Sequence, residues 1–115
     1  MTVSATFDQS APSTGTGCVE CLATGGWWFH LRRCAACGHI GCCDSSPSQH
    51  ASRHAADGAH PVVQSYEPDE DWFWDYPHDR YVKGPPLHPP TSYPRSQAAP
   101  GPAGAVPTGW RTQLH

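Results

Sequence analysis

The chain has 115 residues and a formal net charge of −3, with seven Lys and Arg residues against ten Asp and Glu residues. Only 37% of the residues are hydrophobic, and 11 Gly and 13 Pro leave too little apolar material for a large core along the whole length. The acidic balance excludes the broad basic surface that nucleic acid requires. No run approaches the roughly 20 apolar residues of a membrane span. The first fifteen residues lack a secretory signal, so we expect a cytoplasmic protein. The charge balance and the lack of a long apolar run lead us to expect neither nucleic-acid nor membrane partners.

Composition divides the chain into three parts. Residues 1–16 are small and polar and show no hydrophobic period, which predicts a disordered N-terminal segment. Residues 84–115 contain eight Pro and four Gly and no acidic residue, which predicts a mobile Pro/Gly-rich tail with Trp110 as its one possible anchor. The folded domain is therefore expected in residues 17–83.

The first predicted element of the folded part is a strand over residues 27–32. Apolar and polar positions alternate there, so that Trp27, Phe29 and Leu31 would share one face. This alternation is the period of a strand with one side toward a core.

A helix is predicted next. Ser46 can accept a hydrogen bond at a helix start, and Pro47 fits the first helical position. The helix would continue to about Ala56 and end at Asp57, because Gly58 can adopt the left-handed conformation that closes a helix.

Two further strands are predicted after this helix, over residues 61–66 and 72–76. The second would place Trp72, Trp74 and Tyr76 on one face. The elements together predict a short sheet with one helix packed on it.

Cysteine and histidine residues are concentrated between Cys18 and His60, and eight of them have the spacing of metal ligands. In chain order they are Cys18, Cys21, Cys34, Cys37, Cys42, His50, His54 and His60. Two residues separate the members of each of the first two Cys pairs, which lets two thiolates converge on one ion. His50 and His54 are four positions apart and would point to one side of the helix. Thiolates combined with imidazoles favour zinc among the common metals.

Eight ligands complete two tetrahedral sites, but two pairings are open. In a sequential order the four residues Cys18, Cys21, Cys34 and Cys37 would form the first site. In an interleaved order one site is Cys18, Cys21, Cys42 and His50, and the other is Cys34, Cys37, His54 and His60. Interleaving would make each ion bridge distant segments, which stabilises a domain this small. The spacing alone does not decide between them.

Other uses of the thiols lead to different functions. Six cysteines could form a disulfide framework with 15 possible connectivities, but that would leave the three spaced histidines unexplained. Cys34 and Cys37 have the spacing of a redox pair but lack a thioredoxin-like strand–helix context. Two complete sites leave no open position for a catalytic water, so we expect no enzyme. Cys43 is an extra thiol, and the alternative function is a thiol-based redox or zinc-reservoir protein.

The ligand pattern resembles that of the UBP-type (ubiquitin-protease-type) zinc finger over roughly residues 17–82. The segments Cys37-Gly38-His39-Ile40-Gly41-Cys42 and Gly58-Ala59-His60-Pro61-Val62-Val63 carry the resemblance, which is closest to the short stand-alone bacterial members. The resemblance implies the interleaved pairing and two Zn²⁺ ions. It also implies an α+β fold with a small twisted antiparallel sheet and one main helix, here flanked by disordered termini.

Eukaryotic members of this family bind the free C-terminal Gly-Gly tail of ubiquitin. The resemblance places the corresponding candidate peptide site at Arg32, Asp44, Trp74, Tyr76 and Tyr81. Asp44 stands where those members use an Arg to hold the terminal carboxylate, and Arg32 stands where they have a stacking Trp. A carboxylate at position 44 would repel another carboxylate. We therefore expect a non-catalytic protein- or peptide-binding module with an altered pocket, in which Arg32 could hold a carboxylate from a different direction.

Overall fold

The computed structural model of the chain describes residues 6–115. The chain forms one five-stranded antiparallel sheet with the strand order β2-β1-β3-β4-β5. The strands are β1 Leu31–Cys34, β2 Ile40–Cys42, β3 Val62–Ser65, β4 Phe73–Asp75 and β5 Arg80–Val82. The short helix α1 spans Val19–Thr24, the main helix α2 spans His50–Gly58, and a 3₁₀ turn η1 spans Trp110–Gln113. The prediction of an α+β fold with one main helix is confirmed.

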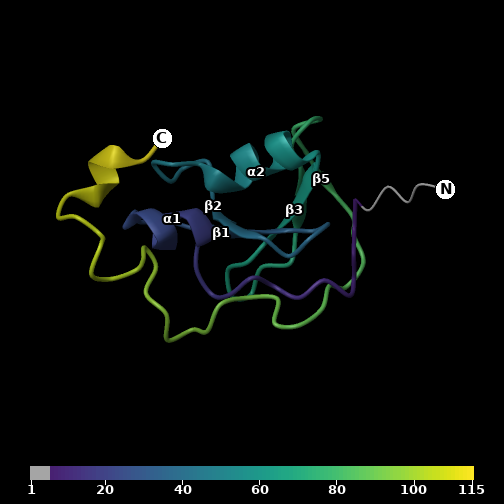
Figure 1. Cartoon of the computed structure of the whole chain (residues 1–115), viewed down its shortest axis with the longest axis horizontal. Helices are drawn as coiled ribbons and strands as arrows, with labels where there is room; N and C mark the ends of the chain where they lie inside the picture. The colour runs from purple at the N-terminus through teal and green to yellow at the C-terminus, as the bar shows by residue number, and fades with distance from the viewer. Residues whose placement is uncertain (1–5) are drawn as a thin grey trace.

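The helix α2 covers one face of the sheet. The register places Arg32 opposite Gly41 and Ser65, and Val63 opposite Trp74, so these side chains share a face. Helix α2 packs directly against this face at Gly41, where a Cβ atom would lie 2.8 Å from the backbone of Ala51. Figure 1 shows α2 on one side of the sheet, with the N-terminal segment and the chain after β5 running along the other side. The C-terminal end then turns back toward the side of α2, where the amide of His115 donates to the carbonyl of Ser45 at 3.0 Å.

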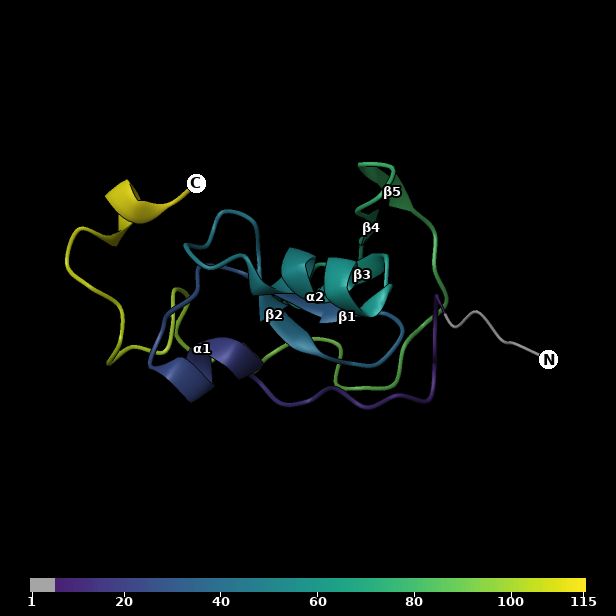
Figure 2. The same cartoon turned by 45° about the horizontal axis from the view of Figure 1, so that its top comes forward.

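The opposite face of the sheet carries most of the apolar core. One buried cluster consists of Cys18, Cys21, Trp28, Leu31, Ile40, Cys42, Tyr66 and Tyr93. A second consists of Ala35, Val62, Phe73 and Leu87, with Phe7 and Val82 packed against it. Both clusters take side chains from outside the central domain, because the segments before α1 and after β5 cover this face (Figure 2).

Arg33 fastens both terminal segments to this face. Its side chain is buried, and its guanidinium donates to the backbone carbonyls of Ala11 (2.6 Å), His88 (2.6 Å) and Pro90 (3.0 Å). A buried guanidinium requires such partners, since its desolvation is otherwise costly. Arg33 therefore connects the two ends of the chain through the sheet.

The C-terminal segment has little regular structure but makes specific contacts with the domain. Leu87 and Tyr93 are buried in the two core clusters, and the backbone of Gly101 forms a two-way hydrogen-bonded bridge with Trp28. Trp110, the expected anchor, packs against Trp27 and Phe29. The expected N-terminal disordered segment includes residues 1–5, which lie outside the described residues.

The structure corrects the start of the first predicted strand. Strand β1 begins at Leu31, not at position 27, and the tryptophan that enters the core is Trp28, which is 2% exposed. Trp27 and Phe29 are half-buried and contact the C-terminal segment instead. The isolated bridge between Trp28 and Gly101, a partner distant in sequence, accompanies this change.

The predicted helix start is also wrong. Helix α2 begins at His50, and Ser46 lies outside it in the connection from β2. The buried Ser46 hydroxyl accepts a hydrogen bond from the backbone amide of Phe29 at 2.8 Å. Ser46 therefore ties this connection to the segment before β1.

Among the described residues, no helix is long and apolar enough to span a membrane.

Candidate metal centres and binding pocket

The first cluster of ligand atoms joins α1, β2 and the start of α2. Cys18 stands at the N-terminus of α1, Cys21 lies within it, and Cys42 ends β2. Nδ1 of His50 lies 3.3 Å from Sγ of Cys18 and 3.4 Å from Sγ of both Cys21 and Cys42. Sγ of Cys21 and Sγ of Cys42 are 4.0 Å apart. The three sulfurs and one nitrogen therefore face a common centre.

The second cluster joins the end of β1 to the far part of α2. Cys34 ends β1, Cys37 lies in the turn to β2, His54 is in α2, and His60 follows it. Nδ1 of His60 lies 3.5 Å from Sγ of Cys34, and Nε2 of His54 lies 3.3 Å from Sγ of Cys37. The two imidazole nitrogens are 3.3 Å apart. The interleaved pairing that the sequence left open is the one observed.

The distances fit tetrahedral zinc. Zinc bonds of about 2.3 Å to sulfur and about 2.0–2.1 Å to nitrogen separate the ligand atoms by roughly 3.3–3.8 Å around a tetrahedron. The observed nitrogen–nitrogen and nitrogen–sulfur separations, 3.3–3.5 Å, match that range closely, and the sulfur–sulfur separation of 4.0 Å is slightly wider. Both clusters therefore suit one Zn²⁺ each.

The three thiols of the first cluster can all ionise only if a cation lies between them. The neighbouring Cys18 and Cys42 thiols, together with burial, raise the pKa of Cys21, whereas hydrogen bonds from Cys18 and Cys21 lower the pKa of Cys42. Three buried thiolates side by side repel one another, so without a positive ion the set cannot fully ionise. A divalent ion offsets this repulsion and binds the thiolate form.

Two zinc-ligand sulfurs also serve as helix caps. Sγ of Cys18 accepts a hydrogen bond from the backbone amide of Cys21 at 3.4 Å, at the start of α1. Sγ of Cys42 accepts one from the amide of His50 at 3.2 Å, at the start of α2. Free backbone amides at a helix start favour a negatively charged partner. The same thiolates therefore bind the metal and fix where the helices begin.

Contacts between the side chains of His54, His39 and Glu20 link the second metal centre to α1, which carries ligands of the first. The ring of His39 stacks on the ring of His54 with centroids 3.9 Å apart, and its Nε2 lies 2.8 Å from a carboxylate oxygen of Glu20 in α1. Burial, with smaller effects from His39 and His60, lowers the pKa of His54. The neutral imidazole that zinc requires is thus favoured at this position.

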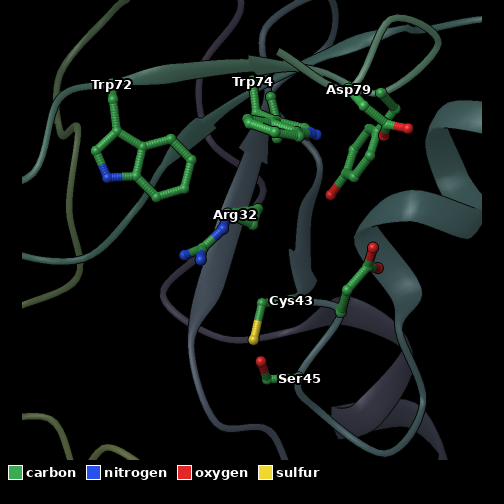
Figure 3. A pocket seen from close by; sticks show the side chains of 9 residues that line it. Arg32, Cys43, Ser45, Trp72, Trp74 and Asp79 are labelled. Atoms are coloured by element: carbon green, nitrogen blue, oxygen red, sulfur yellow. The ribbon is translucent and has the colours of Figure 1, made fainter. Parts of the chain in front are cut away.

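A concave pocket of about 240 Å³ lies beside α2 on the helix-covered face of the sheet. Its wall consists of Arg32, Cys43, Asp44, Ser45, Val63, Trp72, Trp74, Tyr76 and Asp79. Figure 3 shows Trp72 and Trp74 on one side of the pocket, Cys43 and Ser45 on the other, and Arg32 between them. The pocket therefore draws on β1, β3, β4 and the loops after β2 and β4.

Four of the five predicted peptide-site residues meet in this pocket: Arg32, Asp44, Trp74 and Tyr76. Tyr81 does not line it. Its side chain is 66% exposed and packs edge-on against Trp72 and Trp74, with centroids 5.6 and 5.0 Å apart. Tyr81 therefore packs from outside the pocket against Trp72 and Trp74, which together form the tryptophan wall of the pocket.

Sequence reasoning missed five of the nine residues that line the pocket, among them Trp72 and Asp79. The period of the predicted strand had already placed Trp72 on the face of Trp74 and Tyr76, so that signal was present. Asp79 gave no such signal, because it lies in the β4–β5 turn with a positive φ of 47°. Only the folded turn brings it to the pocket.

Comparison with known proteins agrees with this arrangement. The family model described as "Zn-finger in ubiquitin-hydrolases and other protein" matches residues 18–87. This chain belongs to the UBP-type zinc-finger family. A solution NMR structure of protein RPA1320 from Rhodopseudomonas palustris is 37% identical, with a TM-score of 0.61 over 80% of this chain and 86% of that chain. A search of curated proteins finds no match.

Two zinc ions fit the two clusters of this UBP-type zinc finger, one with three Cys and one His ligand and one with two of each. The first cluster is more enclosed, because Cys18, Cys21 and Cys42 are all buried. Cys37 of the second is exposed. Each set of four protein ligands is that of a structural zinc site, whereas catalytic sites keep a position for water.

The remaining thiol of the zinc finger, Cys43, is not one of the eight clustered ligands. It is buried, its Sγ lies 3.4 Å from the Ser46 hydroxyl oxygen, and it forms part of the pocket wall. Its neighbour Cys42 points instead to the first zinc cluster. The two adjacent cysteines thus serve different sites.

Proposed function

We propose that this protein is a non-catalytic module, stabilised by two zinc ions, that binds the C-terminal end of a peptide or protein in the Arg32 pocket. The observation that carries the proposal is the state of Arg32. Its guanidinium lies over the ring of Trp72, 4.6 Å from the centroid, and Nη1 donates to the backbone carbonyl of Leu31 at 3.0 Å. Among residues 6–115, no carboxylate oxygen lies within 4.0 Å of its guanidinium.

An unpaired guanidinium held against an indole face is suited to bind a carboxylate. Stacking fixes the plane of the group and leaves donor atoms free, and guanidinium donors match carboxylate oxygens in pairs. The open side of the pocket lies against solvent, so a chain end can enter while the rest of its protein stays outside. The family's zinc finger is a binding module, which agrees with this use.

The ubiquitin tail is not the favoured ligand. Asp44, next to the pocket's Cys43, places a negative charge at the position where ubiquitin-binding members of the family hold the terminal carboxylate, so a Gly-Gly tail bound in their orientation would be repelled. The proposal therefore assigns carboxylate binding to Arg32 and leaves Asp44 for another part of the ligand.

Binding of short peptides to the zinc-loaded protein tests the proposal. A peptide with a free C-terminal carboxylate should bind with micromolar affinity, as small modular interfaces do, and its C-terminal amide should bind about 10- to 100-fold more weakly, since a hydrogen-bonded charge contributes about 1.5–3 kcal/mol. NMR shift changes should centre on Arg32, Trp74 and Tyr76.

The matched variants are Arg32→Met in the pocket and Arg53→Met on the exposed surface of α2. Arg32→Met should abolish the difference between acid and amide, whereas Arg53→Met should leave it unchanged. Equal binding of the acid and the amide to the unaltered protein would refute carboxylate recognition.

A further inference from the structure

The pocket has a negative end as well as a positive one. Asp44 and Asp79 both line it, and among the described residues neither carboxylate lies within 4.0 Å of a Lys, Arg or His nitrogen. In Figure 3 the guanidinium of Arg32 points toward Trp72, while Asp79 lies beyond Trp74 on the other side. The guanidinium of Arg32 and the carboxylate of Asp79 are therefore kept apart within the pocket, with Trp74 between them.

Tyr76 marks the negative end. Burial raises the pKa of its hydroxyl, and the charge of Asp44 raises it further, while Arg32 acts in the opposite direction. The hydroxyl therefore stays protonated and neutral, and the negative charge of this end comes from the carboxylates of Asp44 and Asp79. An uncompensated negative charge at this end attracts a cation from the ligand.

The aromatic wall between the two ends also suits a cation on an aliphatic stem. Trp74 and Tyr76 present ring surface beside the carboxylates, and amines and guanidiniums bind such surfaces through the ring quadrupole. The methylene groups of a Lys or Arg side chain can pack along the indole while the charged end stays polar.

The size of the pocket limits how much ligand can enter. Its volume of about 240 Å³ is below the roughly 300–1,000 Å³ typical of sites for drug-sized ligands. The space therefore suits a single residue at a chain end. One residue that carries both a carboxylate and a cation is a C-terminal Lys or Arg.

We propose that the pocket selects peptides or proteins whose last residue is Lys or Arg. Arg32 binds the terminal carboxylate, the stem lies on Trp74, and the cationic end is held by Asp44 and Asp79. This inference rests on the proposed function, because it assumes carboxylate binding by Arg32. A Gly-Gly end supplies only the carboxylate and leaves both acidic side chains without a partner.

Four peptides separate the two proposals when titrated into the full zinc-loaded chain by calorimetry. They share the sequence Ala-Ala-Gly-X, with X a free-acid Lys, a free-acid norleucine, a Lys amide, or a free-acid Gly. Norleucine keeps the aliphatic stem and removes the charge. We expect the free-acid Lys peptide to bind at least about tenfold more tightly than each of the other three.

The variant Asp44→Asn/Asp79→Asn should reduce the preference for Lys over norleucine to about one while keeping the binding of norleucine. The control Asp57→Asn, on the exposed surface of α2, should leave the preference intact. Zinc content and circular dichroism of each variant check that the fold is retained.

Equal affinities for the Lys and norleucine acids, with loss of binding for the amide, would overturn the selectivity but leave carboxylate recognition standing. Equal affinities for the Lys acid and its amide, or no binding by any of the four peptides, would overturn both.

Discussion

The backbone amide of His50 donates a hydrogen bond to Sγ of Cys42 at 3.2 Å, and Nδ1 of the same His50 lies 3.4 Å from that sulfur. His50 therefore contacts this sulfur in two ways. Its backbone amide donates to the sulfur at the start of α2, and its imidazole belongs to the same zinc-ligand cluster. Because the second cluster uses His54 and His60, the whole of α2 is held between two ions. The position of α2 therefore depends on zinc binding, because the same residues hold the ions and fix the helix.

Replacing Cys42 by Ser should therefore damage both the metal site and the fold. We expect Cys42→Ser to lose one zinc ion and to lower the melting temperature by more than about 10 °C, since structural zinc sites contribute many kcal/mol to small domains. Cys43→Ser, at the adjacent position, should retain two ions and melt within about 5 °C of the unaltered protein. Zinc content by mass spectrometry and melting by circular dichroism measure both. Loss of zinc in Cys43→Ser instead would exchange the roles of the two thiols.

The contact between β2 and α2 at Gly41 should tolerate no side chain. A Cβ at this position would meet backbone atoms of Ala51 at 2.8 Å, so Gly41→Ala must push the helix away from the sheet. We expect a loss of about 1–3 kcal/mol in the free energy of unfolding. The control Gly104→Ala places its Cβ in open space and should change stability by less than about 0.5 kcal/mol. Urea unfolding followed by tryptophan fluorescence distinguishes them, and equal effects would contradict this packing.

Arg33 should determine whether the terminal segments stay on the sheet. Arg33→Met removes three hydrogen bonds to carbonyls of Ala11, His88 and Pro90. We expect a loss of about 2–4 kcal/mol in stability and faster hydrogen exchange across residues 86–93. Arg53→Met, at an exposed position of α2, serves as the control. Unchanged exchange in Arg33→Met would mean that apolar contacts alone hold these segments.

A buried carboxylate links the C-terminal segment to β1 and makes stability depend on pH. Glu67 accepts hydrogen bonds from the hydroxyl of Tyr93 (2.6 Å) and the amide of Leu31 (2.9 Å), and lies 3.0 Å from Nδ1 of His30. Burial opposes ionisation, but hydrogen bonds from His30, Tyr93 and Leu31 outweigh it and lower the pKa of Glu67. This stabilisation is present above the ordinary pKa of Glu and is lost as the pH falls through the lowered value.

The test is Tyr93→Phe, which removes one of these hydrogen bonds. At pH 7 the variant should be about 1–2 kcal/mol less stable, and the gap to the unaltered protein should shrink as Glu67 takes up a proton in acid. Comparing the two proteins at each pH removes the acid loss of zinc that both share. Tyr81→Phe, on the exposed surface, is the control. A gap that is constant with pH would show that the Tyr93 hydroxyl stabilises the fold independently of the charge on Glu67.

The ligand set could be predicted from the sequence because metal binding needs short, regular spacings, and the pairs Cys18–Cys21 and Cys34–Cys37 have them. The tryptophan face of β4 was likewise visible in the alternation of residues 72–76. The start of α2 was not visible, because the Cys42 sulfur and not Ser46 accepts the hydrogen bond at its first turn. Which group accepts this hydrogen bond depends on the metal centre, and the sequence around the start of the helix carries no signal of that.

The contacts of the C-terminal segment could not be predicted for a different reason. Composition averages over residues 84–115 and is dominated by Pro and Gly, whereas two isolated side chains, Leu87 and Tyr93, provide the burial. Their partners, among them Phe73 and Tyr66, are far away in sequence. Only the assembled sheet face shows where such single anchors fit.

The zinc content of the purified protein tests the central claim most directly. Native mass spectrometry of protein prepared without added metal, compared with the same sample denatured in acid, gives the number of bound ions. Two crosswise tetrahedral clusters predict a mass difference of two zinc ions per chain. A difference of one ion, or of none in a folded protein, would contradict the account.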